Sequence, residues 1–129
     1  MSKYIFIFLL MSFSCAQSGK QEAIELRTPQ AIADQLKSNS EIVVIDVRTP
    51  EELQSGFIAG AVNLNYNSPS FQQSLDSLDL SRTYLVYCAV GKRSDKAQKM
   101  MKEKGFEHIL SIDGGLNAWV AAGLPVRKP

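Results

Sequence analysis

The stretch "TYLVYCAVGKRSDKAQKMMKEKG", residues 83–105, indicates the fold most directly. Its first six residues form a continuous run that is typical of a strand buried on both faces of a parallel sheet. Gly91 then permits a tight turn, and the residues from about Ser94 onward predict a helix that ends at Gly105. A strand, a turn and a helix in this order form the repeating unit of α/β proteins.

Strands and helices also alternate along the rest of the chain. Further strands are predicted at 41–47, 59–64 and 108–112, and further helices at 28–38, 49–53, 68–80 and 114–122. Thr28 and Ser68 each precede a proline and are predicted as helix caps. Glu52 follows Thr49 by three residues, which is the pattern of a capping box on a short helix. The alternation predicts an α/β fold with a parallel sheet flanked by helices on both faces.

Three polar segments follow directly on predicted strands, at residues 46–48, 88–94 and 113–115. In open α/β sheets, ligands bind at the carboxyl ends of the strands. We therefore expect these three segments to converge in space and to form the functional site.

Composition restricts the function further. The chain has 129 residues, of which 45% are hydrophobic and 21% charged, so one globular domain is expected. The formal net charge is only +1, and no broad basic field is available to recruit nucleic acid. Any electrostatic contribution to function must therefore be local.

The N-terminal segment differs from the rest of the chain. Lys3 is followed by the apolar run "YIFIFLLMSF" and then by "SCAQSGK", which is the order of a secretory signal. The apolar run is too short for a membrane-spanning helix. We predict a signal peptide at residues 1–14, a polar tether at 15–25 and one domain at 26–129.

Cys15 indicates which kind of signal peptide this is. The sequence "SFSC", residues 12–15, resembles the lipobox of bacterial lipoproteins, although Ser12 stands where leucine is usual. The resemblance implies a lipidated Cys15 as the mature N-terminus and a protein anchored by lipid to a membrane of the cell envelope, on the periplasmic side. The alternative is ordinary cleavage near Ala16. Lipidation of Cys15 would leave Cys88 as the only thiol, without a disulfide partner.

The turn after Cys88 favours a reactive thiol. The backbone N–H groups of residues 89–94 precede a helix and have no helical acceptors, so they can curl around the sulfur. Such a nest stabilises a thiolate and lowers the thiol pKa. Lys92 and Arg93 would add positive potential, and the site would then attract an anionic substrate.

Other cysteine chemistries fit less well. A Cys–His protease needs an imidazole beside the thiol, but the only histidine, His108, lies at the predicted start of a strand. A zinc site needs three or four ligands, and a thioredoxin-type pair needs a second nearby cysteine. A buried structural cysteine remains the unreactive alternative.

Four blocks of the sequence closely resemble the signatures of the rhodanese (sulfurtransferase) family. These blocks are "DVRTPEEL", "GFIAGAVNL", "YCAVGKRS" and "DGGLNAW", at residues 46–53, 56–64, 87–94 and 113–119. The resemblance implies a five-stranded parallel sheet and a catalytic Cys88 that carries a persulfide. It also implies a small anionic sulfur donor such as thiosulfate and a thiol or cyanide acceptor, with no metal or other cofactor.

The resemblance implies roles for other residues too. The active-site loop would comprise Ala89, Val90, Gly91, Lys92, Arg93 and Ser94. Asp46 and Arg48 would form a structural ion pair, and Gly114 and Gly115 would allow close backbone approach. We expect Arg93 to turn inward toward loop carbonyls or a carboxylate, and Lys92 to point outward toward the anion.

The spacing in the loop separates sulfurtransferases from related enzymes. Four residues lie between Cys88 and Arg93, as in sulfurtransferases, whereas related phosphatases and arsenate reductases have five. One block departs from the family pattern, because Phe57 and Ala59 replace the usual histidine and proline. We expect Phe57 to compensate by packing.

Two further interpretations stay open at this point. The rhodanese fold also serves as a non-enzymatic binding module, and the thiol of Cys88 could instead sense oxidation. We find no surplus apolar face in the sequence, so a monomer is expected.

Overall fold

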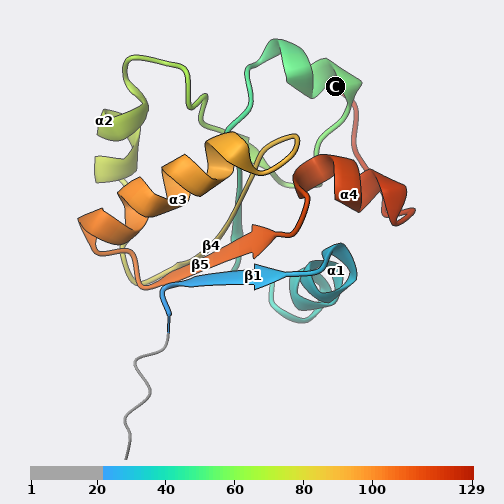
Figure 1. The fold of residues 1–129 in the computed structure, drawn as a ribbon, viewed down its shortest axis with the longest axis horizontal. Coiled ribbons are helices and arrows are strands. Elements are labelled where there is room, and N and C mark those ends of the chain that lie inside the picture. The colour runs from blue at the N-terminus through green and yellow to red at the C-terminus, as the bar shows by residue number, and fades with distance from the viewer. Residues whose placement is uncertain (1–21) are drawn as a thin grey trace, which may run out of the picture.

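The computed structural model describes residues 22–129, which form five strands and four α-helices around one sheet (Figure 1). The strands are β1 (Ile24–Arg27), β2 (Val43–Asp46), β3 (Val62–Asn63), β4 (Thr83–Tyr87) and β5 (His108–Ile112). The helices are α1 (Pro29–Ser38), the 3-10 helix η1 (Glu51–Ser55), α2 (Phe71–Asp76), α3 (Lys92–Lys104) and α4 (Gly115–Ala121). All neighbouring strands are parallel, in the order β1-β5-β4-β2-β3. The predicted five-stranded parallel α/β fold is therefore confirmed.

Each face of the sheet packs against its own hydrophobic core. One core joins inward side chains of the strands to α2 and α3, through Phe71, Leu75, Ala97 and Met101. The other core joins the opposite face to α1 and α4, through Ile32, Ala33, Leu116 and Trp119. The central strands β4 and β5 are buried on both faces after their first residues, which explains the continuous run of large, mostly apolar side chains in β4.

Local signals in the sequence account for most helix ends. The Thr28 side chain accepts a hydrogen bond from the Ala31 N–H at 3.2 Å, as a helix cap should. The carboxyl end of helix α3 is also as expected, because Gly105 adopts the left-handed conformation (φ 98°) that ends the helix. These two predictions are confirmed.

Several predicted boundaries are wrong. Ser68 does not cap α2; its hydroxyl accepts from the Ser70 N–H and its carbonyl from the Phe71 N–H, so it forms a turn that delays the helix to Phe71. Helix α3 begins at Lys92, two residues earlier than expected, because Gly91 already accepts the first helical hydrogen bond from Asp95. The segment after Thr49 is a 3-10 helix.

The N-terminal boundary also shifts. Strand β1 begins at Ile24 and pairs with β5, so Ile24 and Glu25 belong to the sheet and not to the predicted tether. The predicted signal peptide, residues 1–14, and the predicted lipidation site, Cys15, lie outside the described residues. Within residues 22–129, no helix is long and apolar enough to cross a membrane.

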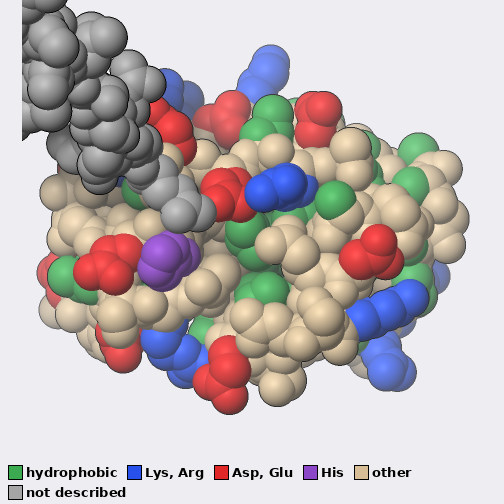
Figure 2. Space-filling view, turned by 90° about the horizontal axis from the view of Figure 1, so that it is seen from below, with side chains coloured by type: hydrophobic (Ala, Val, Ile, Leu, Met, Phe, Trp, Pro, Cys, Tyr) green, Lys and Arg blue, Asp and Glu red, His purple; other side chains and the backbone are tan. Residues whose placement is uncertain are grey.

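Charged groups on the surface are mixed in sign. Figure 2 shows acidic and basic side chains scattered over the face seen from below, without an extended field of either sign. This distribution agrees with the formal net charge of +1. Electrostatic effects in this protein therefore arise at individual positions.

Candidate active site

Cys88 lies directly after β4, at the carboxyl edge of the sheet and between the ends of β2 and β5. The residue is 1% exposed, so only a narrow group can reach its sulfur. The Gly91 N–H donates a hydrogen bond to Sγ at 3.1 Å, and the Ser94 hydroxyl lies 3.4 Å from the same atom. The turn therefore bends back over the sulfur, as the sequence predicts.

The start of α3 surrounds the thiol with hydrogen-bond donors. Gly91 has a φ of 109°, a conformation that suits glycine and turns the chain from the strand into the helix. Burial raises the pKa of the Cys88 thiol, but hydrogen bonds from the Ser94 hydroxyl and from the N–H groups of Ser94, Gly91 and Val90 lower it. The hydrogen bonds prevail, and the pKa lies below its ordinary value.

Helix α4 holds the other side of the turn. The Leu116 and Asn117 N–H groups donate to the carbonyl oxygens of Cys88 and Ala89, at 2.9 and 3.0 Å. In a trans peptide the carbonyl and the next N–H point in opposite directions. Because the two carbonyls point to α4, the N–H groups of Ala89 and Val90 point away from it.

Gly115 makes this contact possible. A Cβ atom at this position would lie 2.7 Å from the Ala89 carbonyl oxygen and 2.8 Å from that of Cys88. Any side chain would therefore push α4 off the cysteine turn. At the preceding position, a Cβ on Gly114 would lie 2.7 Å from Cβ of Ala118.

Asp46 and Arg48 form a buried ion pair beside this turn. Arg48 Nη2 and Nε donate to the Asp46 carboxylate at 2.7 to 3.1 Å, and the same guanidinium also donates to the carbonyl oxygens of Glu52 and Gly56. The pair thus ties the end of β2 to η1 and to the residue after it. This geometry fits a structural ion pair.

Arg93 forms an ion pair that the sequence analysis did not assign. Its Nη1 and Nη2 atoms lie 2.7 and 2.8 Å from the two carboxylate oxygens of Glu52, so the pair is bidentate. The carboxylate expected opposite Arg93 is therefore that of Glu52. Arg93 lowers the pKa of Glu52 to about 2, although burial opposes the shift and Thr49 assists it.

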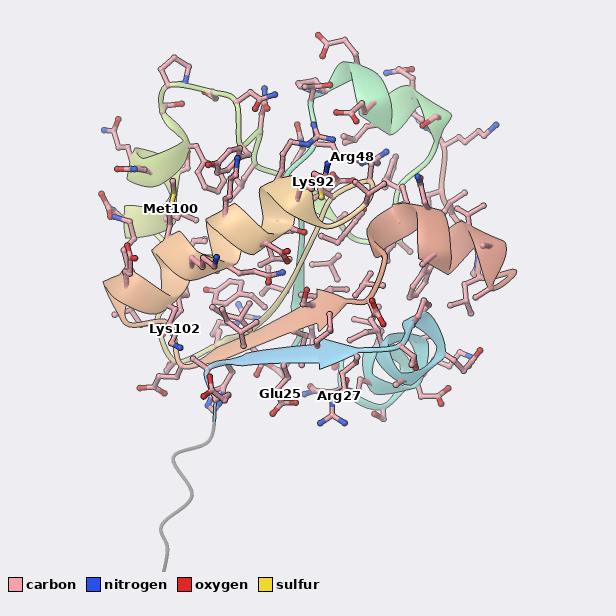
Figure 3. All side chains as sticks on the ribbon, in the orientation of Figure 1. Glu25, Arg27, Arg48, Lys92, Met100 and Lys102 are labelled. Atoms are coloured by element: carbon pink, nitrogen blue, oxygen red, sulfur yellow. The ribbon has the colours of Figure 1, made fainter. Side chains whose placement is uncertain are left out.

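This pairing corrects one expectation. The charge of Arg93 is balanced by Glu52, so Arg93 adds little positive potential for a substrate. Lys92 is exposed and, within residues 22–129, forms no ion pair. Figure 3 labels Lys92 and the buried Arg48, which are drawn close together near the start of α3 in this view. Lys92 is thus the loop cation that remains available to an incoming anion.

The capping box explains why Glu52 was missed. Its Oε2 atom accepts from the Thr49 N–H at 2.9 Å, so the predicted local role is confirmed. The same carboxylate also reaches Arg93, which is 41 residues further along the chain. A local pattern gives no sign of this second partner.

Phe57 is only half-buried. It is held by its backbone, whose N–H and carbonyl pair with Arg127 at 2.8 and 2.7 Å. These two main-chain hydrogen bonds hold the backbone at position 57 whichever side chain it carries.

In the described part of the chain, Cys88 is a free cysteine, and no group of three or more His, Cys, Asp or Glu side chains could hold a metal ion. Fold and site together define an α/β protein with one cysteine at its candidate centre, enclosed by hydrogen-bond donors. The family model of the rhodanese-like domain matches residues 28–122, and the chain belongs to this family.

Individual relatives agree with this assignment. A sulfurtransferase of Allochromatium vinosum is 28% identical over 100 residues, which cover 78% of this chain and 92% of the relative. The thiosulfate sulfurtransferase GlpE of Vibrio cholerae is 29% identical over 104 residues, which cover 81% of this chain and 92% of the relative. A crystal structure of a rhodanese-related protein from Thermoplasma volcanium is 28% identical with a TM-score of 0.71, covering 80% of this chain and 97% of that one. These relatives support rhodanese-type sulfur transfer as the general function.

Proposed function

We propose that this protein transfers a sulfane sulfur from a small anionic donor, such as thiosulfate, to a thiol or cyanide through a persulfide on Cys88. One observation carries the proposal: the buried Sγ accepts a hydrogen bond from the Gly91 N–H at 3.1 Å and lies 3.4 Å from the Ser94 hydroxyl. Such donors stabilise both a thiolate and the negative charge of a persulfide. No metal or organic cofactor takes part in this scheme.

The first step is attack of the Cys88 thiolate on the outer sulfur of thiosulfate. A bond forms between Sγ and that sulfur, the S–S bond of thiosulfate breaks, and its electron pair leaves with sulfite. In the second step, cyanide or a thiolate attacks the outer sulfur of the persulfide. The bond to Sγ breaks, Cys88 returns to the thiolate, and thiocyanate or a new persulfide is released.

The free cation at the rim favours an anionic donor. Lys92 is exposed beside the turn, whereas Arg93 is paired with Glu52. We expect Lys92→Gln to slow persulfide formation from thiosulfate severalfold, since it removes the attraction of a cation that no described carboxylate neutralises. Lys96→Gln is the matched control, because Lys96 is an exposed cation of the same helix outside the loop.

The test is intact mass spectrometry of the full chain after incubation with thiosulfate. The expected result is a gain of one sulfur atom that is lost on addition of cyanide and does not occur in Cys88→Ser. A protein that gains no sulfur from thiosulfate or from polysulfide would refute the proposal. A gain of one oxygen at Cys88 under mild oxidant, without any persulfide, would favour the oxidation-sensing alternative.

We also propose that residues 1–14 are a signal peptide and that a lipid on Cys15 anchors a monomer in the cell envelope, on the periplasmic side. The sequence of the N-terminal segment supports this proposal. Cys15→Ala should release the protein from the membrane fraction without changing persulfide formation at Cys88. Membrane association of Cys15→Ala equal to that of the unmodified sequence would refute the lipid anchor, and a dimer by sedimentation would refute the monomer.

A further inference from the structure

A cavity of about 580 Å³ lies on the α1–α4 side of the sheet. Its walls come from α1, the start of β2, the turn at residues 59–60, α4 and the segment that follows α4. Helices α1 and α4, which lie close together in Figure 1, contact each other beside this cavity. The volume falls within the range of roughly 300–1,000 Å³ that is usual for small-molecule sites.

Apolar side chains form most of this cavity. Leu36 and Ile42 are only partly buried and pack at the border of the hydrophobic core. Trp119 also lines the cavity, and its position is fixed because Nε1 donates to the Pro125 carbonyl oxygen at 2.9 Å. The cavity therefore offers a preformed apolar surface to a ligand.

The polar groups lie together, at the end of α1. Lys37, Asn39 and Ser40 line the cavity there, and no acidic side chain lines it. Asn39 Oδ1 accepts from the Glu41 N–H, which leaves the amide NH₂ as a donor. Lys37 forms no ion pair in the described part of the chain. An ammonium and an amide donor thus lie beside an apolar surface, and no carboxylate of residues 22–129 lines the cavity or pairs with Lys37.

We propose that this cavity binds a small amphipathic anion, in which an apolar body occupies the pocket beside Trp119 and a carboxylate or sulfonate pairs with Lys37. We infer an anion because the polar end of the cavity carries a positive charge, and we infer an amphipathic ligand because the other walls are apolar. None of the cavity-lining residues belongs to the loop of residues 88–94. This site is therefore spatially separate from the cysteine turn, and its proposal does not rest on the proposed sulfur transfer.

Trp119 supplies a reporter, because it is the only tryptophan of the chain. The experiment titrates the full chain with dodecanoate, dodecanol and dodecyltrimethylammonium below their micelle concentrations, and follows Trp119 fluorescence. The three probes share one apolar body and differ in the charge of the head. Dodecanoate should shift the emission saturably and bind at least about fivefold more tightly than the cationic probe, as expected for one ion pair of about 1 kcal/mol.

Two variants separate the charge from the apolar surface. Lys37→Glu should weaken dodecanoate binding at least about fivefold, whereas the matched charge reversal Lys99→Glu, at an exposed position of α3, should not. Ala59→Phe adds bulk at an exposed position of the cavity wall and should weaken all three probes. Circular dichroism and persulfide formation at Cys88 check that each variant is folded.

Three results would overturn the proposal. Equal affinity for the anionic and the cationic probe would show a nonspecific apolar surface. Unchanged binding of dodecanoate by Lys37→Glu, or by folded Ala59→Phe, would place the probe elsewhere. Trp119 emission that depends on protein concentration without any probe would show that a second copy of the chain covers the cavity.

Discussion

The turn that carries Cys88 is held on two sides by different forces. On the α4 side, backbone hydrogen bonds from Leu116 and Asn117 hold it, and Gly115 allows the close approach. On the η1 side, the ion pair of Arg93 with Glu52 joins the start of α3 to η1, and the buried pair of Arg48 with Asp46 ties η1 to the end of β2. The backbone hydrogen bonds fix the direction of the peptide groups at any pH. The stabilising free energy of the ion pairs, in contrast, depends on how deeply they are buried and on the protonation of their carboxylates. The four predictions below test this division, from the largest expected effect to the smallest.

The largest effect is expected from Arg48→Met. This substitution leaves the fully buried Asp46 without its counter-charge, and breaking a buried pair costs about 3–5 kcal/mol. The free energy of unfolding, measured with urea, should fall by that amount. Arg82→Met, at an exposed arginine that donates to the Glu41 carbonyl, is the control and should change it by less than about 1 kcal/mol. Similar losses in the two variants would contradict the structural role of the buried pair.

Gly115→Ala should have the next largest effect. The added Cβ would meet two carbonyl oxygens within 2.8 Å, and the φ of 63° adds strain, so we expect a loss of about 2–4 kcal/mol and slower persulfide formation. Gly123→Ala is the matched control. Gly123 also has a positive φ, of 76°, but nothing lies within 4 Å of its Cβ position. If both variants lose the same stability and react equally fast with thiosulfate, strain alone explains the effect and close approach to the turn does not matter.

Ser94→Ala tests the donors around the sulfur. The variant loses a buried hydroxyl that lies 3.4 Å from Sγ and 3.1 Å from the Gly91 carbonyl oxygen and can donate its one proton to either atom, which should cost about 1 kcal/mol. The pKa of Cys88 should rise, because burial, which raises it, is then opposed by fewer hydrogen bonds. The rate of thiol alkylation against pH measures this pKa, with Ser77→Ala at an exposed position as the control. A rate profile that does not move would show that the backbone N–H groups alone set the thiolate.

Glu52→Gln should have the smallest effect on stability. The Glu52 and Arg93 side chains are 35% and 26% exposed, so water screens the pair and its loss should cost at most about 1 kcal/mol. The pKa of Glu52 is lowered to about 2 from 4.5, so the pair stabilises the fold above about pH 4.5 and loses this contribution as the pH falls toward 2.

The pH dependence of unfolding checks the assignment of Glu52. The difference in stability between the unmodified protein and Glu52→Gln should be constant near neutral pH and should shrink on acidification. Glu51→Gln, at the exposed neighbouring position, supplies the control. A difference that grows on acidification would have the wrong sign for a carboxylate stabilised by Arg93.

Signals confined to a few residues made most of the fold predictable. The capping residue Thr28, the helix-ending Gly105 and the apolar run before Cys88 each act within one turn or one strand, so each can be read locally. Strand β1 has only four residues, two of them exposed, and so its sequence pattern is too weak to separate it from a tether. Ser68 misled the prediction because its side chain can serve a turn as well as a helix cap.

The part of the site that is formed by one continuous segment of the chain was predictable. The position of Cys88 and the donors around it follow from the loop sequence, whereas the partner of Arg93 does not. Glu52 and Arg93 meet only because the parallel sheet brings the ends of β2 and β4 together. The cavity beside Trp119 is likewise formed by segments that are distant in sequence and meet only in the fold, so no local sequence motif predicts it.

The hydrogen bond from the Leu116 N–H to the Cys88 carbonyl has a consequence for folding kinetics. Helix α4 holds the peptide groups that follow Cys88 and Ala89 in their final direction, through the N–H groups of Leu116 and Asn117. We therefore expect the reactivity of the Cys88 thiol at neutral pH to rise during refolding when α4 docks, so that the rate of thiol alkylation can follow the formation of this contact.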